Sequence, residues 1–175
     1  MKFLKWGAAG LVALVALVFA VGLLAPAEHE ARCRIELPAS PPEAVWALVG
    51  DIAGWSEWNS LVDRMEPRTS EEGVESWTMV SEWGEMPARV EAREPLRRLE
   101  VHLDGGDFEG YWRYAITPGA SGGSTLEITE TGRLSNPLMR AIGLFMDEHE
   151  SMRTCMTDLA AKLGEKDAKP ENIAL

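Results

Sequence analysis

The sequence contains few of the residues that build metal and redox centres, with only two cysteines and three histidines among its 175 residues. His29, His102 and His149 lie far apart, and neither a His-x-x-x-His nor a Cys-x-x-Cys pair is present, which excludes the common zinc-site patterns. The sequence also lacks a Gly-x-Ser-x-Gly motif, a phosphate-binding loop and a dinucleotide fingerprint. We therefore expect neither a metal ion nor a cofactor.

The two cysteines are Cys33 and Cys155. If the domain is exported from the cytoplasm, they could form a disulfide. Alternatively, each could be a small buried apolar residue. The sequence leaves both interpretations open, because it does not show how far apart the two residues lie in space.

Basic residues are scarce in most of the chain. Lys2 and Lys5 are the only charged residues among the first 27, so the rest of the chain has 15 basic and 28 acidic residues. An acidic domain without a basic patch is poorly suited to bind nucleic acid or anionic lipid headgroups. We therefore exclude nucleic acid as a partner; the sequence does not specify an oligomeric state.

There is one long hydrophobic run, residues 6–24, which contains no charged residue. As a helix these 19 residues would be roughly 28 Å long, enough to cross a bilayer. We interpret residues 1–27 as a membrane anchor with a cytoplasmic N-terminus, which places the domain in the periplasm or outside the cell. The alternative is a cleaved signal peptide and a secreted domain, because Ala25-Pro26-Ala27 resembles a cleavage site.

The middle of the chain is typical of short strands joined by turns. A capping box that starts at Ser40 predicts a helix through Val49, and residues 51–58 predict a second helical turn. Alternating polarity and turn residues predict seven strands, at residues 31–37, 61–68, 74–83, 85–94, 97–103, 108–117 and 124–134. Their short connections indicate an antiparallel sheet. We expect the polar residues 164–175 to form a disordered tail.

A long amphipathic helix is predicted over residues 136–163. Asn136 is a good N-cap, Pro137 suits the first helical position and Gly164 favours a stop. One helical face carries Leu138, Ile142, Phe145, His149, Met152, Met156, Leu159 and Leu163. An apolar helix face after a run of strands predicts an α+β fold in which the sheet packs against that helix.

Four strings in this order resemble a known superfamily. They are PASPPEAVW at 38–46, DIAGWSEWN at 51–59, REPLRRL at 93–99 and GYWRY at 110–114. They resemble the START-like (SRPBCC) superfamily, and within it the polyketide cyclase/dehydrase-like branch, some members of which have an N-terminal anchor. The resemblance covers residues 31–163. It implies a helix-grip fold, in which a seven-stranded antiparallel sheet wraps around a long C-terminal helix, with a hydrophobic cavity between them.

Relatives use that cavity to hold lipids, sterols or polyketides. Large apolar and aromatic side chains on the inward register either fill the core or line such a cavity. The candidate lining residues are Trp58, Trp77, Met79, Met86, Trp112, Tyr114, Phe145, His149, Met152 and Met156. The first hypothesis is therefore a domain that binds an apolar or amphipathic small molecule.

His149 is the one ionisable residue in the helical stripe. It is either a partly buried structural histidine or a group that orients a ligand or transfers a proton, with Glu130 or Tyr114 as its partner. The second interpretation supports an alternative function, a cyclase or dehydratase that uses His149, Glu130 and Tyr114 as catalytic residues. A further alternative is a protein-interaction module whose acidic outer sheet docks a basic protein.

Overall fold

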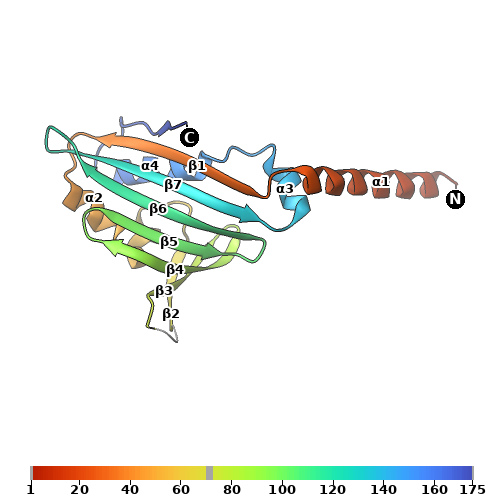
Figure 1. The fold of residues 1–175 in the computed structure, drawn as a ribbon, viewed down its shortest axis with the longest axis horizontal. Helices are drawn as coiled ribbons and strands as arrows, with labels where there is room; N and C mark the ends of the chain where they lie inside the picture. Colours follow the sequence, from red (N-terminus) through yellow and green to blue (C-terminus); the bar gives the residue numbers. More distant parts are fainter. Residues whose placement is uncertain (1, 70–72, 175) are drawn as a thin grey trace.

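The chain, described by a computed structural model, forms one α+β domain from which a single long helix projects (Figure 1). The structure describes residues 2–69 and 73–174, and it describes residues 2–9, 11 and 12 by their backbone only. The helices are α1 (Lys2–Leu24), α2 (Pro42–Val49), the 3-10 helix η1 (Ile52–Glu57), α3 (Pro137–Gly143) and α4 (Glu150–Lys162).

The strands are β1 (Glu28–Leu37), β2 (Arg64–Arg68), β3 (Ser76–Ser81), β4 (Gly84–Glu94), β5 (Arg98–Asp104), β6 (Phe108–Pro118), β7 (Ser124–Leu134) and β8 (Glu171–Asn172). They form one antiparallel sheet in the order β2-β3-β4-β5-β6-β7-β1-β8. Strands β3 to β7 lie side by side in chain order, and β1 pairs with β7. The antiparallel prediction is confirmed, but the sheet has eight strands in the described chain instead of the predicted seven.

The additional strand comes from the C-terminal tail, which was predicted to be disordered. After Gly164, which has a positive φ of 86°, the chain returns along β1, and Asn172 pairs with Cys33. The Asn172 Oδ1 accepts a hydrogen bond from Arg153 Nη1 at 3.2 Å, and Glu171 forms an ion pair with Arg34. Polar contacts therefore hold a polar tail on the domain, and composition alone does not reveal such contacts.

Alternate residues of the sheet point to an inner face that packs on α4. Cys33, Ile35 and Leu37 of β1 are fully buried, as are Met152, Met156 and Leu159 of α4. Helices α2 and η1 cover another part of this face, and Val45, Val49, Ile52 and Trp55 join the same core. The inner face of the sheet is thus buried, as the alternation of apolar and polar residues along the strands predicts.

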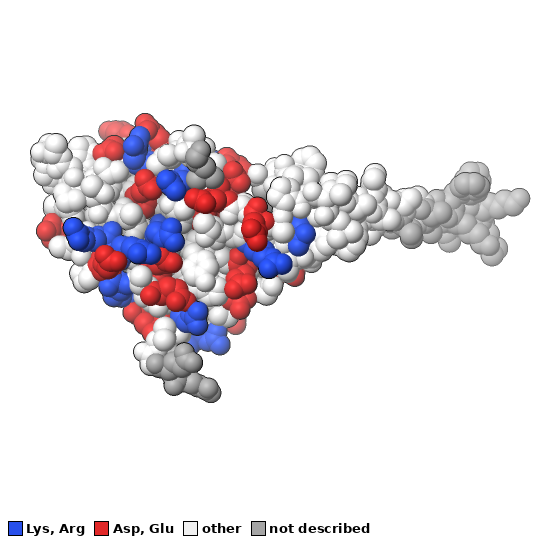
Figure 2. Space-filling view, viewed as in Figure 1, with Lys and Arg blue, Asp and Glu red and all other residues white. Residues whose placement is uncertain are grey.

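The outer face carries arginine and glutamate side chains in alternation. Glu100 accepts hydrogen bonds from Arg98 and Arg113, and these bonds lower the pKa of Glu100, the Arg113 bond most strongly. Figure 2 shows charges of both signs interspersed over this face instead of a continuous acidic surface.

The prediction of a single helix over residues 136–163 is wrong, because two helices, α3 and α4, occupy this segment. Its ends are as predicted: Asn136 Oδ1 accepts a hydrogen bond from Leu138 N at 3.0 Å, and Gly164 follows α4. The break lies at Asp147, whose Oδ1 accepts a hydrogen bond from His149 N at 3.0 Å. A side chain that bonds nearby backbone N–H groups competes with a continuous helix, and here it precedes the start of α4.

The predicted capping box at Ser40 is also wrong. Pro41 is the N-cap of α2 and makes no side-chain cap bond. The Ser40 hydroxyl instead donates to Glu165 beyond α4, and the Ser40 carbonyl accepts from Ser124 Oγ at 2.7 Å. Ser40 therefore joins the ends of three elements.

Helix α1 meets the domain at α3, where Gly22 lies against the backbone of Pro137 (Figure 1). An added Cβ at Gly22 would lie 1.7 Å from the Pro137 carbonyl oxygen, so the close crossing requires glycine. No helix in the described part of the chain is long and apolar enough to cross a membrane. The predicted span, residues 6–24, falls partly on side chains outside the described residues.

Candidate functional site

A cavity of about 210 Å³ lies between the inner face of the sheet, the loop after η1 and the start of α4. Its lining is mainly apolar and comes from η1, the loop after it, strands β3 to β7 with the turn between β3 and β4, and the start of α4. The lining residues are Trp55, Asn59, Leu61, Val62, Met79, Ser81, Trp83, Met86, Val101, Leu103, Phe108, Trp112, Tyr114, Glu130 and Ser151. Trp83, in the turn between β3 and β4, is 75 % exposed and therefore lies at the opening.

Three aromatic rings form one wall of the cavity. The Tyr114 ring lies 5.7 Å from the Trp55 ring and 6.1 Å from the Trp112 ring, between centroids. Tilted rings at these distances stabilise each other. Trp112 and Tyr114 share a face because they are two residues apart on β6, and Trp55 reaches them from η1. This wall offers flat apolar surfaces to a ligand.

The Tyr114 hydroxyl is buried and forms a hydrogen bond with the Cys155 thiol of α4. Burial raises the pKa of Tyr114 well above its usual value, and burial raises the pKa of Cys155 to about 12. Both groups stay protonated at neutral pH, so Cys155 is not a nucleophilic thiolate there.

The second polar feature of the cavity is the pair formed by Glu130 and His29. Glu130 Oε1 lies 2.9 Å from His29 Nε2, and the two side chains are 11 % and 23 % exposed. The hydrogen bond to Glu130 raises the pKa of His29, while burial acts in the opposite direction; the charges of Glu130 and Glu148 also raise it. His29 therefore keeps its proton to a higher pH than a free imidazole.

Two glycines make room for this pair. Gly110 of β6 pairs with Gly132 of β7, and neither places a side chain on the inner face. A Cβ at Gly132 would lie 2.5 Å from His29 Cε1 and 2.6 Å from Phe108 Cε2. The His29 and Phe108 rings thus occupy the space above the glycines, 6.2 Å apart between centroids.

The structure brings five of the predicted site residues to the cavity: Met79, Met86, Trp112, Tyr114 and Glu130. Trp58, Met152 and Met156 are buried in the core but do not line it, and Trp77 packs at the edge of the core. Phe145 does not reach the cavity at all, because it lies in the segment between α3 and α4 and is 90 % exposed.

His149 also lies outside the cavity. It is the N-cap residue of α4, and its Nδ1 lies 3.6 Å from Asp147 Oδ1. The expected pairing of His149 with Glu130 is therefore not formed, and His29 takes that position. His29 was missed because the first strand was predicted to begin at residue 31. Extending its alternation back from Cys33 and Ala31 would have placed His29 on the inner face.

Cys33 and Cys155 are both free and buried, so they do not form a disulfide. Among the described residues, no group of three or more His, Cys, Asp or Glu side chains could hold a metal ion. The chemistry available in the cavity is therefore that of the Glu130–His29 pair and a few neutral polar groups.

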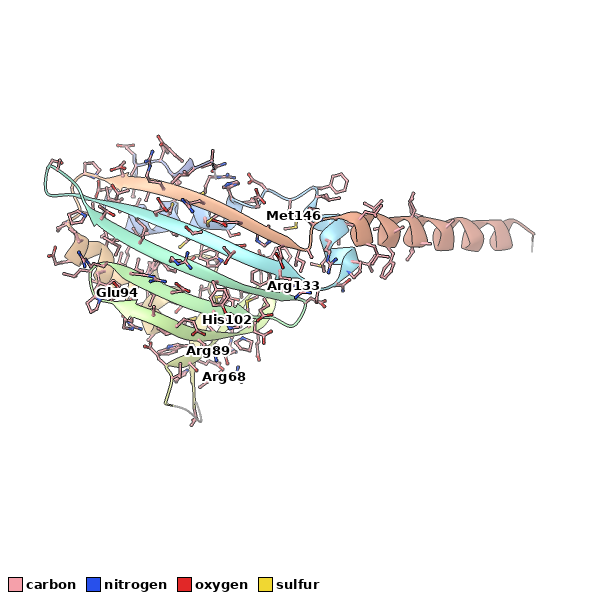
Figure 3. The ribbon with its side chains drawn as sticks, in the orientation of Figure 1. Arg68, Arg89, Glu94, His102, Arg133 and Met146 are labelled. Atoms are coloured by element: carbon pink, nitrogen blue, oxygen red, sulfur yellow. The ribbon has the colours of Figure 1, made fainter. Side chains whose placement is uncertain are left out.

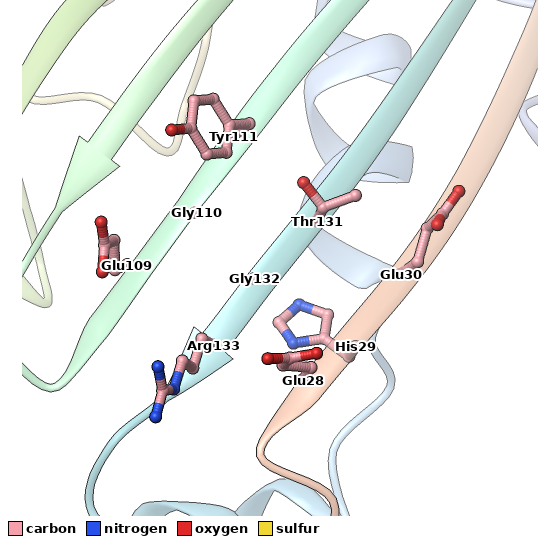
Figure 4. A pocket seen from close by; sticks show the side chains of 9 residues that line it. All are labelled: Glu28, His29, Glu30, Glu109, Gly110, Tyr111, Thr131, Gly132 and Arg133. Carbon is pink, nitrogen blue, oxygen red and sulfur yellow. The ribbon is translucent and has the colours of Figure 1, made fainter.

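A larger hollow, about 470 Å³, lies over β1, β6 and β7 (Figure 4). Its lining residues are Glu28, His29, Glu30, Glu109, Gly110, Tyr111, Thr131, Gly132 and Arg133. It is shallow, and most of its lining side chains are polar or charged, so it lacks the enclosed apolar surface that is typical of small-molecule sites. We therefore take the inner cavity as the candidate site. His29 lines the outer hollow and pairs with Glu130, which lines the inner cavity.

The chain is similar in fold to several solved structures. The Zhui aromatase/cyclase from Streptomyces sp. R1128 has 14 % identity and a TM-score of 0.63, over 80 % of this chain and 94 % of that one. A START superfamily protein from Mycobacterium smegmatis has 14 % identity and a TM-score of 0.61, over 78 % and 98 %. A protein from Thermobifida fusca has 19 % identity and a TM-score of 0.60, over 79 % and 95 %.

A comparison with curated proteins found no match. The family model for polyketide cyclase / dehydrase and lipid transport matches residues 29–164, which is most of the chain. The match includes α4 and the whole sheet except Glu28 of β1 and all of β8. With the helix-grip arrangement of sheet and α4, this match shows that the chain belongs to the polyketide cyclase / dehydrase and lipid transport family.

Proposed function

We propose that this domain binds a small apolar or amphipathic molecule in the inner cavity. The observation that carries the proposal is a cavity of about 210 Å³ with aromatic and aliphatic walls. An engineered apolar cavity of roughly 150 Å³ in another protein binds benzene. This volume therefore suits a molecule of one or two rings, and a whole sterol or a long lipid chain would require the cavity to expand.

Binding can be tested by calorimetry with naphthalene as the probe. Trp55, Trp83 and Trp112 line the cavity, so their fluorescence should also change when naphthalene binds. Met86→Trp should abolish binding by filling the cavity, whereas Met146→Trp in the exposed segment after α3 should leave it unchanged. Equal binding to both variants would contradict the proposal.

A cyclase-like activity is the second candidate, and the Glu130–His29 pair favours it. A buried carboxylate next to an apolar pocket can remove a proton from carbon beside a carbonyl group, and a histidine can hold that carboxylate in place. The Zhui protein, similar in fold, is an aromatase/cyclase. Proton NMR in D₂O can follow deuterium uptake at C1 of 2-tetralone. Catalysed uptake that is lost in Glu130→Gln but kept in Glu127→Gln would support the activity; uptake at the uncatalysed rate would exclude it for this substrate.

The interaction-module alternative is not favoured. Charges of both signs are interspersed over the outer sheet, and many are already paired within the chain, for example Arg93 with Glu75 and Arg89 with Glu91 (Figure 2). Such a face does not present the single-sign surface that would attract a basic partner.

We also propose that residues 6–24 anchor the domain to a membrane, with the domain in the periplasm or outside the cell. The proposal is based on the uncharged sequence of this run. It is consistent with the exposure of apolar side chains of α1, such as Leu17 at 61 % and Leu24 at 89 %. Helix α1 contacts α3, and the segment that follows α3 carries the apolar Met146 (Figure 3), which is 56 % exposed.

An alkaline carbonate wash of membranes from expressing cells tests the anchor. The full chain should remain in the membrane pellet, and Leu14→Arg with Leu17→Arg should release it, because each arginine near the centre of the span costs about 2.5–3.5 kcal/mol. Tyr111→Arg on the outer sheet face is the control. Release of the intact wild-type chain would contradict anchoring, and a mature mass lacking residues 1–27 would show a cleaved signal peptide instead.

A further inference from the structure

Glu130 differs from every other residue that lines the inner cavity. The lining contains three tryptophans, two methionines, other apolar residues and four neutral polar residues, and Glu130 is its one charged residue in the described chain. Burying a carboxylate beside apolar groups is costly unless its oxygens are hydrogen-bonded.

One partner of Glu130 is His29, whose Nε2 lies 2.9 Å from Glu130 Oε1. An ionised carboxylate has about four acceptor positions on its two oxygens. The bond to His29 uses one of them, on the side of β1. Because Glu130 also lines the cavity, its remaining acceptor capacity can serve a bound molecule.

The location of His29 is set by the fold and not by a flexible loop. It lies on β1, beside β7, and its ring fits into the space above Gly132 and against Phe108. His29 therefore holds Glu130 in a defined orientation. With His29 protonated the pair is neutral overall, so it does not require a cationic ligand.

We propose that Glu130 is a specificity-determining residue that accepts a hydrogen bond from a hydroxyl or N–H group of the bound molecule. The ligand class is then a one-ring or two-ring apolar compound with a hydrogen-bond donor at one end. The aromatic wall of Trp55, Trp112 and Tyr114 contacts the ring system, and Glu130 binds the donor. This inference rests on the proposed binding function and adds the chemistry of the ligand to it.

Two probes of almost the same shape test the inference, 2-naphthol with a donor and 2-methylnaphthalene without one. Calorimetry on the full chain gives the ratio of their affinities. Hydrogen bonds to charged groups correspond to roughly tenfold or more in affinity, so 2-naphthol should bind at least about tenfold more tightly. The ratio should fall in Glu130→Gln and approach one in Glu130→Leu.

Glu127→Gln is the matched control, because Glu127 is on the same strand but on the outer face, beside Arg32. It should keep the wild-type ratio. Circular dichroism checks that each variant is folded, and Glu130→Gln, the most conservative change, remains informative if Glu130→Leu does not fold.

The outcomes separate the two proposals. If both probes bind the wild type equally, or if the preference for 2-naphthol persists in Glu130→Gln and Glu130→Leu, the assignment of Glu130 is wrong while the binding function stands. If neither probe nor naphthalene binds the wild-type chain, the binding function itself is wrong.

Discussion

The C-terminal segment consists of two halves with the same apolar spacing and opposite surroundings. In the covered half, residues 150–162, Met152, Met156 and Leu159 have no exposed surface. In the uncovered half, residues 137–149, Phe145 is 90 % exposed and Met146 56 %. Helix α4 lies under the sheet, whereas α3 lies beside α1 at the end of the domain (Figure 1). Spacing indicates which side chains share a face, but whether that face is buried depends on what covers it.

The two halves should differ most in how methionine contributes to stability. Met156→Ala removes a fully buried side chain and should lower the free energy of unfolding by about 2–5 kcal/mol. Met146→Ala makes the same chemical change in the uncovered half and should alter it by no more than about 0.5 kcal/mol. Urea denaturation followed by tryptophan fluorescence measures both. Similar losses in the two variants would mean that the uncovered half is also packed.

Glycine substitutions should sharpen the contrast further. Gly132→Ala places a Cβ against His29 and Phe108 and should cost about 1–3 kcal/mol, because the rings must move. Gly143→Ala, at the end of α3, meets only Leu134 Cδ1 at 3.6 Å. It should be neutral or stabilise the protein by up to about 1 kcal/mol. Thermal denaturation compares them, and a harmless Gly132→Ala would show that the rings can be accommodated elsewhere.

The two histidines provide a comparison through pH. The Glu130 hydrogen bond raises the pKa of His29 in the folded state. The stabilising contribution of this hydrogen bond is therefore complete below the pKa of His29 in the unfolded chain, near 6.5. It is lost as the pH rises through the pKa of His29 in the folded protein. His29→Gln should remove this pH-dependent contribution, about 1 kcal/mol or less because the pair is partly exposed. His149→Gln should retain it. Urea denaturation between pH 5.5 and 8.5 measures the difference, and identical curves for His29→Gln and the wild type would contradict it.

The smallest effect on stability is expected for Phe145→Ser. The side chain is 90 % exposed, so its loss should change the free energy of unfolding by no more than about 0.5 kcal/mol. The variant should instead elute earlier from a hydrophobic-interaction column, because less apolar surface is exposed. A clear loss of stability would indicate that Phe145 packs against the domain.

Much of the fold could be predicted because its signals are local. Alternating residues predicted strands β4 to β7 and their inner face, and Asn136 and Gly164 predicted where the C-terminal helical segment begins and ends. The strings at 38–46 and 51–59 identified the superfamily, in agreement with the family match over residues 29–164. Each of these depends on neighbours in the chain or on a short motif.

Specific side-chain contacts, which a periodic pattern does not encode, decided the rest. The break at Asp147 depends on a short side-chain bond that competes with a helix pattern that would otherwise continue. The return of the tail to β1 depends on Asn172 meeting Arg153 and Cys33, 139 residues away in the latter case. The periodic pattern is the same on both sides of Asp147, so it does not predict the break, and it ends before the tail begins.

The candidate site illustrates the same division. By itself, the sequence determined that Met79, Met86, Trp112, Tyr114 and Glu130 lie on one face of the sheet, because side chains alternate along a strand. Only the tertiary structure decided that His29, and not His149, meets Glu130. That pairing joins residues 101 positions apart and depends on the space left above Gly132, where the absence of a side chain allows two rings to fit.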